Sequence, residues 1–160
     1  MFDIRGVCAR LLLVSGLLLG ADMLRADSLP LPPLPVTNGV VYALHVQDGH
    51  LYIAGSFTQV GGVDRNGLAA IDIVSRTLVS NWDPDLGAGG VGRTLLAAAD
   101  GRSLYVGGTF AAVGVDTRSL LAEIDIDPDS STYGRAASWN PMITGSAINA
   151  VALSPGGSLL

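Results

Sequence analysis

Short apolar runs separated by turn-forming residues dominate the chain after residue 38. In the first stretch, strands are expected at residues 40–46, 50–56, 67–73 and 77–82. Asp48-Gly49 separates the first two runs, and Asp-Gly favours a tight hairpin turn. A Gly-rich loop is expected over residues 58–66, and Pro84 ends the last run because proline cannot donate into a sheet. The pattern therefore predicts four short antiparallel strands.

The same pattern returns 53 residues further on. Residues 51–61 and 104–114 share Leu-Tyr, Gly, Phe and Val-Gly in the same order. The corresponding strands are expected near residues 92–98, 103–109, 120–126 and 134–139. A third copy is expected to begin at residue 147, with Leu160 falling inside it. Such a period indicates one supersecondary unit that is used several times.

Four strands per copy of about 50 residues are typical of β-propeller blades. We therefore expect an all-β fold of four-stranded antiparallel propeller blades, incomplete, with about two blades and the start of a third. The expected boundaries are repeat 1 at 39–90, repeat 2 at 91–146 and the truncated third copy at 147–160. A β-solenoid or a β-sandwich is the alternative, although solenoid coils usually have shorter periods.

The repeated segment resembles a known family. Residues 51–72, followed by Asn81-Trp82-Asp83-Pro84, are similar to the delta-60 repeat, a bacterial β-propeller family of largely unassigned domain function. The resemblance covers residues 40–160 and implies a large exported or cell-surface protein, often with adhesion-type domains. Glu123, which stands where the first copy has Ala70, departs from the pattern.

The first 26 residues have the layout of a secretory signal peptide. Arg5 and Arg10 precede an apolar run at residues 11–21, and small residues follow at Ala21 and Ala26. Cleavage is expected after Ala26, with Ala21 as the second choice. The apolar run is shorter than the roughly 20 residues that span a bilayer, so no stable membrane span is expected after cleavage. An uncleaved anchor or a buried helix is the alternative.

A Pro-rich linker is expected at residues 27–38, extended because proline fixes φ. Cys8 is the only cysteine and lies before the apolar run. The mature chain would therefore have no disulfide and no thiolate metal site.

The charge of the chain argues against a nucleic-acid partner. The formal net charge is −5, all nine basic residues are Arg, and Glu123 is the only Glu among 14 acidic residues. Nucleic-acid binding depends on Arg and Lys that neutralise phosphates, so no nucleic-acid partner is expected. The 21 Gly and the excess of Asp favour turns over helices.

One unrepeated segment is a weak candidate for a calcium site. Asp125, Asp127 and Asp129 alternate as in the start of a calcium loop, which needs hard oxygen ligands. Ser130 stands where such a loop has Gly, and Ala136 where it has Glu. A plain Asp-rich turn is therefore favoured, and no other metal, cofactor or catalytic residue is predicted.

The residues that recur in both copies are expected to be structural. Arg65 is expected to pair with Asp72, and Arg118 with Asp125, which would order the long loops. The recurring aromatic residues are expected to pack between blades, with a carbohydrate-stacking platform as the alternative. They are Tyr52 and Tyr105, Phe57 and Phe110, and Trp82 and Trp139.

These features favour a non-catalytic scaffold or recognition module of a larger secreted or cell-surface protein. The expected partners are the remaining blades of the same chain and a glycan or other cell-surface ligand. The alternative is part of a propeller enzyme, a hydrolase, lyase or oxidase that acts on extracellular polysaccharide. That enzyme would need catalytic residues from blades outside this sequence.

Overall fold

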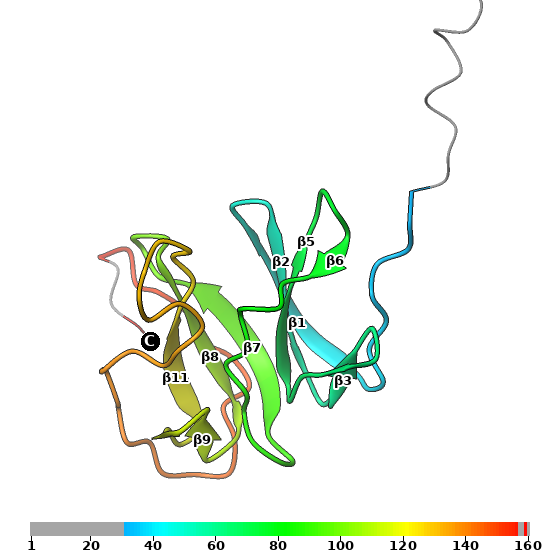
Figure 1. The fold of residues 1–160 in the computed structure, drawn as a ribbon. Coiled ribbons are helices and arrows are strands. Elements are labelled where there is room, and N and C mark those ends of the chain that lie inside the picture. Colours follow the sequence, from blue (N-terminus) through cyan, green and yellow to red (C-terminus); the bar gives the residue numbers. More distant parts are fainter. Residues whose placement is uncertain (1–30, 157–158, 160) are drawn as a thin grey trace, which may run out of the picture. The chain divides into compact units, whose positions relative to one another are not determined.

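The computed structural model describes residues 31–156 and 159. From Pro33 onward the chain forms one unit, which is built from antiparallel β-sheets (Figure 1). The described residues include no helix. The expectation of an all-β fold is therefore confirmed.

The first sheet is a four-stranded meander in the order β1-β2-β5-β6. Its strands are β1 (Val41–Gln47), β2 (His50–Gly55), β5 (Leu68–Asp72) and β6 (Thr77–Leu78). Asp48 and Gly49 form the tight turn between β1 and β2, both with positive φ, as the Asp-Gly pair predicts. The predicted fourth strand at 77–82 is wrong in length. It ends after Leu78 because the next carbonyls, of Val79 and Ser80, turn toward the guanidinium of Arg65.

A short hairpin lies within the predicted loop at residues 58–66. It consists of β3 (Gln59–Val60) and β4 (Val63–Asp64). Gly61 and Gly62 connect the two strands and both have positive φ, which glycine adopts without strain. The sequence pattern predicts a Gly-rich loop there, without this hairpin.

The second sheet repeats the order of elements. Its regular strands are β7 (Val91–Ala97), β8 (Ser103–Thr109) and β11 (Leu121–Asp125), arranged as β11-β8-β7. A small hairpin of β9 (Ala112–Val113) and β10 (Asp116–Thr117) again precedes the last of these strands. The strand predicted at 134–139 is reduced to one bridge between Ile124 and Ala136, because the longer loop after Asp125 brings the chain back irregularly.

The two sheets pack through unlike faces. The front face of the first sheet, defined by Tyr52, Ala54, Leu68 and Ala70, shares one core with the second sheet. The second sheet contributes its opposite face to this core, the back face. That face comprises Leu95, Ala97, Leu104, Val106, Ala122 and Ile124.

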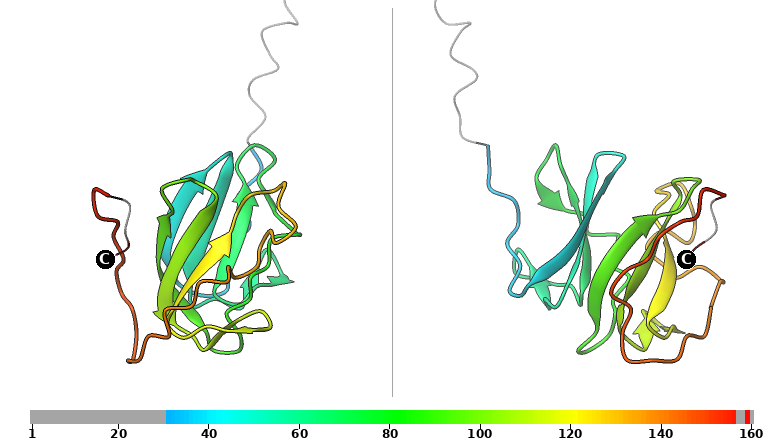
Figure 2. Two further views of the ribbon diagram at one scale, coloured as in Figure 1. Left: turned by 90° about the vertical axis from the view of Figure 1, so that its left-hand side faces the viewer. Right: turned by 180° about the vertical axis from the view of Figure 1, so that it is seen from behind.

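The sheets approach most closely at their first strands. β7 lies beside β1 and β2, while the outer strands of the two sheets lie farther apart (Figures 1 and 2). Arg93 at the bulge of β7 stacks over the ring of Tyr42 at the bulge of β1, with 5.7 Å from the guanidinium carbon to the ring centroid. Gln47 donates from Nε2 to the carbonyl of Gly101 at 2.8 Å and ties the two neighbouring turns together.

Two equivalent glycines show why the motif of each copy needs a residue without a side chain. A Cβ at Gly55 would collide with the carbonyl of Val40, and a Cβ at Gly108 would collide with the carbonyl of Val91. Neither glycine has positive φ, so the constraint is close backbone approach and not a left-handed conformation.

We expect Gly55→Ala and Gly108→Ala each to lower the free energy of unfolding by about 1–3 kcal/mol, because the first strand must shift to admit a methyl group. Urea denaturation followed by tryptophan fluorescence measures this. Ala111→Ser, at an exposed position in the link between β8 and β9, is the control and should have little effect. Wild-type stability of both glycine variants would contradict the argument from close approach.

Candidate functional site

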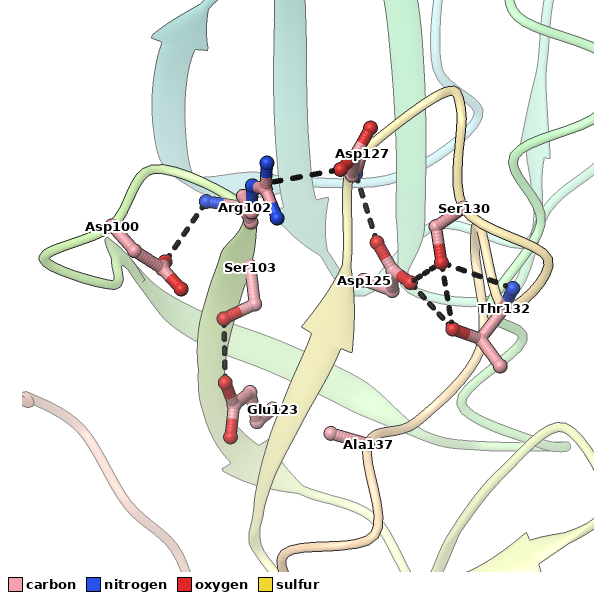
Figure 3. Close-up of a pocket in the computed structure, with 9 residues that line it drawn as sticks. All are labelled: Asp100, Arg102, Ser103, Glu123, Asp125, Asp127, Ser130, Thr132 and Ala137. Atoms are coloured by element: carbon pink, nitrogen blue, oxygen red, sulfur yellow. Dashed lines mark hydrogen bonds and ion pairs between the residues drawn. The ribbon is translucent and has the colours of Figure 1, made fainter.

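A polar depression lies on the front face of the second sheet, near the end of β11. It has a volume of about 290 Å³ and is open to solvent (Figure 3). The β7–β8 turn contributes one wall and the loop after Asp125 contributes the other. Its lining residues are Asp100, Arg102, Ser103, Glu123, Asp125, Asp127, Ser130, Thr132 and Ala137.

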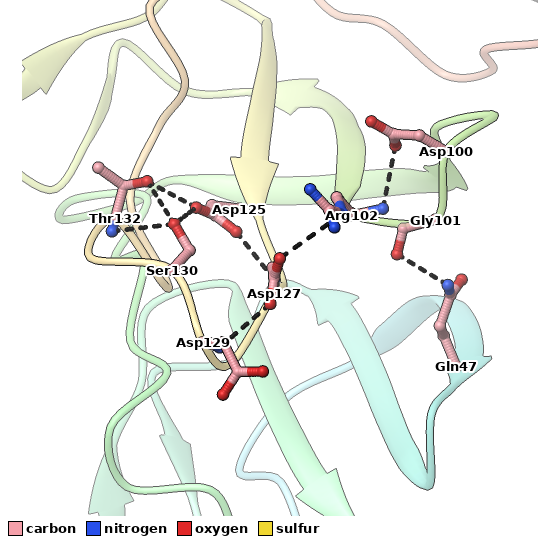
Figure 4. Close-up of polar contacts among 9 residues, drawn as sticks. All are labelled: Gln47, Asp100, Gly101, Arg102, Asp125, Asp127, Asp129, Ser130 and Thr132. Atoms are coloured by element: carbon pink, nitrogen blue, oxygen red, sulfur yellow. Dashed lines mark hydrogen bonds and ion pairs between the residues drawn. The ribbon is translucent and has the colours of Figure 1, made fainter.

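Asp125 organises the loop that follows it. Its carboxylate accepts hydrogen bonds from the hydroxyls of Ser130 and Thr132, at 2.5 and 2.6 Å, and from the backbone N–H of Asp127 at 2.8 Å (Figures 3 and 4). Burial raises the pKa of this carboxyl, but the hydrogen bonds from Ser130 and Thr132 outweigh it, and the pKa lies below its usual value. Asp125 is therefore an ionised carboxylate that is occupied by loop donors.

The other two acidic residues of the calcium candidate are used differently. Asp127 accepts the backbone N–H of Asp129 at 3.1 Å and faces Arg102, with 3.7 Å between Nε and the carboxylate (Figure 4). Within residues 31–156 and 159, no three His, Cys, Asp or Glu side chains gather in an arrangement that could hold a metal ion. Calcium binding by Asp125, Asp127 and Asp129 stays a prediction.

A second polar pair in the depression is absent from the first sheet. The Ser103 hydroxyl donates to the Glu123 carboxylate at 2.6 Å, and Ser103 is buried. The first copy has His50 and Ala70 at these two positions. In the sequence, Glu123 stands out only as a departure from the repeated motif. The pairing could have been expected because Ser103 lies opposite Asp125, two residues from Glu123, which makes Ser103 and Glu123 diagonal neighbours on one face of the sheet.

The predicted Arg–Asp pairs within each copy are wrong. Arg65 contacts the Asp83 carboxylate at 3.2 Å and donates to the carbonyls of Asp64 and Ser80. Asp72 instead accepts the N–H and the hydroxyl of Ser75, in the turn that follows its own strand. Backbone and side-chain hydrogen bonds from Ser75 lower the pKa of Asp72.

Arg118 repeats this arrangement without a carboxylate. It donates to the carbonyls of Thr117 at 2.9 Å and Ala137 at 2.7 Å. Asn140 stands where the first copy has Asp83, directly after the tryptophan. The longer loops are thus ordered by arginine, as expected, but its principal acceptors are backbone carbonyls.

We expect Asn140→Asp to raise the free energy of unfolding by about 0.5 kcal/mol, because it gives Arg118 the partner that Arg65 has. Asn140 is exposed, so a carboxylate there would lose little hydration. The measurement is chemical denaturation at low and high salt, since screening should remove the gain. Ser138→Asp, at an exposed position on the same segment, is the control for charge alone. An equal gain in that control would contradict a specific Arg118 pair.

Asp125 should give the protein a measurable acid sensitivity. Its folded-state pKa lies below the ordinary 3.8, so its stabilising contribution is complete above that pH and is lost as the pH falls through the folded value. We expect Asp125→Asn to cost about 1 kcal/mol at neutral pH and to flatten the decline in stability below pH 4. Thermal unfolding across this pH range measures the effect. Asp129→Asn, which removes a carboxylate from the same loop, is the control for the loss of one negative charge.

The recurring aromatic residues differ in their surroundings. Tyr52 and Trp82 are buried and meet edge to face, with 5.0 Å between ring centroids. Burial raises the pKa of Tyr52 far above its usual value. Tyr105 and Trp139 make the same kind of contact at 5.6 Å, but Trp139 is exposed. The predicted role in packing is therefore seen for Tyr52 and Trp82.

Comparison with known proteins gives no assignment: no protein-family model matches, no curated protein is significantly similar in sequence, and no solved structure is significantly similar in fold. Within the described part of the chain, no helix has the length and apolar character needed to cross a membrane. The fold and the depression together define an all-β protein of stacked antiparallel sheets.

Proposed function

We propose that this chain is a segment of an exported β-propeller, which serves as a non-catalytic scaffold or recognition module of a larger secreted or cell-surface protein. The observation that carries the proposal is the packing of two alike antiparallel units, front face against back face and closest at β1 and β7. In a β-propeller, the blades lie closest together at their first strands, around the central axis, and spread apart outward.

Export is the part of the proposal that rests on the sequence. The basic residues, the apolar run at 11–21 and the small residues at Ala21 and Ala26 support a cleaved signal. Expression of the whole chain in a bacterial host, with mass spectrometry of the secreted product, tests it. The expected N-terminus is Asp27, or Asp22 for the alternative site. Retention of the intact chain inside the cell would contradict export.

A scaffold or recognition role is favoured over catalysis by how the polar groups are used. The carboxylate of Asp125 is engaged by loop hydroxyls, and Glu123 is engaged by Ser103. The propeller proposal places further blades of the same chain next to these two, and a glycan or other cell-surface ligand is the proposed partner.

The secreted chain should be tested on a glycan array and, in parallel, for release of reducing ends from extracellular polysaccharides. Binding without release is the expected result. Release of reducing ends that Glu123→Gln abolishes, while the fold is retained, would overturn the non-catalytic role.

A further inference from the structure

The small hairpin of the second copy is held by the segment that joins the two sheets, residues 83–86, the junction segment. The N–H of Gly114, in the β9–β10 turn, donates to the carbonyl of Asp85 at 2.7 Å. The same segment is bound to the first copy, because Asn66 accepts the N–H of Leu86 at 3.0 Å and donates from Nδ2 to Asp85 at 2.9 Å. The junction segment therefore connects one copy to the hairpin turn of the next.

The equivalent turn of the first copy is filled by residues 35–38, the strap. The N–H of Gly61, in the β3–β4 turn, donates to the carbonyl of Val36 at 2.8 Å. Each of the two accepting residues directly follows a proline, Pro35 or Pro84. Pro35 lies against the turn, since a Cβ on Gly61 would be 3.2 Å from its own Cβ. The strap thus occupies on the first copy the place that the junction segment occupies on the second.

Asn38 fastens the strap through contacts that the second copy does not repeat. Its Oδ1 accepts the backbone N–H groups of Thr58 and Gln59, both at 2.9 Å, and its Nδ2 donates to the Thr58 hydroxyl at 2.8 Å. Its backbone N–H also donates to the carbonyl of Gln59 at 3.2 Å. Ala111 and Ala112 stand at these two positions in the second copy, so no hydroxyl is present there.

The strap and the junction segment reach their glycines by different backbone paths. Thr37 forms an antiparallel bridge with Val60, so the strap runs beside β3 (Figure 1). Asp85 has a left-handed φ of 52°, whereas Val36 does not have positive φ. What the two segments share is the carbonyl that they bring to the glycine N–H of the turn.

We infer that the strap is an end cap: it closes the receiving turn of the first copy, so that no other junction segment can dock there. Further units can then follow the second copy but cannot be joined in front of the first copy through a junction segment. At the second copy the outgoing end has the features of a junction segment, because Met142 follows Pro141, has a left-handed φ of 49° and is 78% exposed. The inference goes beyond the proposed function and rests on the contacts at Gly61.

The first test is amide hydrogen exchange, followed by NMR, on the whole chain as recovered from cells. We expect Asn38→Ala to accelerate exchange at Gly61 at least tenfold, because the strap loses three side-chain hydrogen bonds. Exchange at Gly114 should not change. Val36→Ala is the matched control on the strap, since this side chain is 76% exposed and its carbonyl remains. Unchanged exchange at Gly61 in Asn38→Ala, or equal acceleration at Gly114, overturns the inference.

A second measurement separates an end cap from a segment that is merely fastened. The probe is a synthetic peptide with the sequence of residues 81–88, which includes the junction segment, and a scrambled peptide is the control. In excess, the peptide should slow exchange at Gly61 in Asn38→Ala and have no effect on the wild type, where the strap fills the turn. Equal slowing in both chains, or slowing in neither, overturns the role as an end cap. Both results are independent of export and of glycan binding.

Discussion

Replacing Trp82 by alanine is expected to lower the free energy of unfolding by about 3–5 kcal/mol, the range for removing a large buried aromatic side chain. Trp82 has no exposed surface and packs edge to face on Tyr52. It also supplies the hydrogen bond to Asp125 that joins the two sheets. The substitution therefore removes core volume and leaves a carbonyl of the neighbouring sheet with one donor fewer.

The equivalent position in the second copy provides the control. Trp139 makes the same kind of ring contact with Tyr105 but is partly exposed, so Trp139→Ala should cost about 1 kcal/mol. Trp82→Phe separates the two contributions of Trp82, because it keeps most of the volume and removes the indole donor; about 1–2 kcal/mol is expected.

The measurement is urea denaturation of dilute protein, followed by far-ultraviolet circular dichroism so that loss of a tryptophan does not change the probe. Equal costs at residues 82 and 139 would contradict an inter-sheet role that is specific to Trp82.

The strands that could be predicted are those whose turns have a strong local preference. Asp48-Gly49 fixes β1 and β2, and the motif around Gly55 and Gly108 places β2 and β8. Predicting the last strand of each copy failed because tertiary contacts decide where it ends. Arg65 captures the carbonyls after Leu78, and the long loop after Asp125 leaves only Ala136 paired.

The partners of the recurring polar residues could not be derived from their recurrence. Asp72 recurs as Asp125, and both carboxylates bond to hydroxyls of the turn that follows. An Asp three residues before Ser75 is the local signal that would have indicated this. The true partner of Arg65 is Asp83, which the second copy replaces with Asn140, so a search restricted to repeated residues excludes it.

The second large effect on stability concerns Arg65. Its size depends on whether Asp83 or the backbone carbonyls are the main hydrogen-bond partners of the guanidinium. The Arg65 side chain is 6% exposed and donates to carbonyls of Asp64, Val79 and Ser80 as well as to Asp83. The Asp83 side chain is 44% exposed, and burial raises its pKa more than Arg65 lowers it. The ion pair is therefore the weaker component, and the carbonyls provide most of the compensation for the buried guanidinium.

We expect Arg65→Ala to lower the free energy of unfolding by about 3–5 kcal/mol, because it removes a buried guanidinium that donates to three carbonyls and opens a void. Asp83→Asn should change it by no more than about 1 kcal/mol, since the surface-exposed partner contributes little. Arg118→Ala should cost about 1 kcal/mol, because Arg118 is less buried and donates to two carbonyls.

The three variants are compared by chemical denaturation at neutral pH and again at pH 4. A raised folded-state pKa means that ionised Asp83 contributes less than the protonated form, so its contribution is present at low pH and is lost as the pH rises through the folded value. Asn is the neutral isostere of protonated Asp83, so Asp83→Asn should be closest to the wild type at low pH and at least as stable as the wild type at neutral pH. A cost for Asp83→Asn that equals that of Arg65→Ala would show instead that the ion pair, and not the carbonyl set, holds the loop to the sheet.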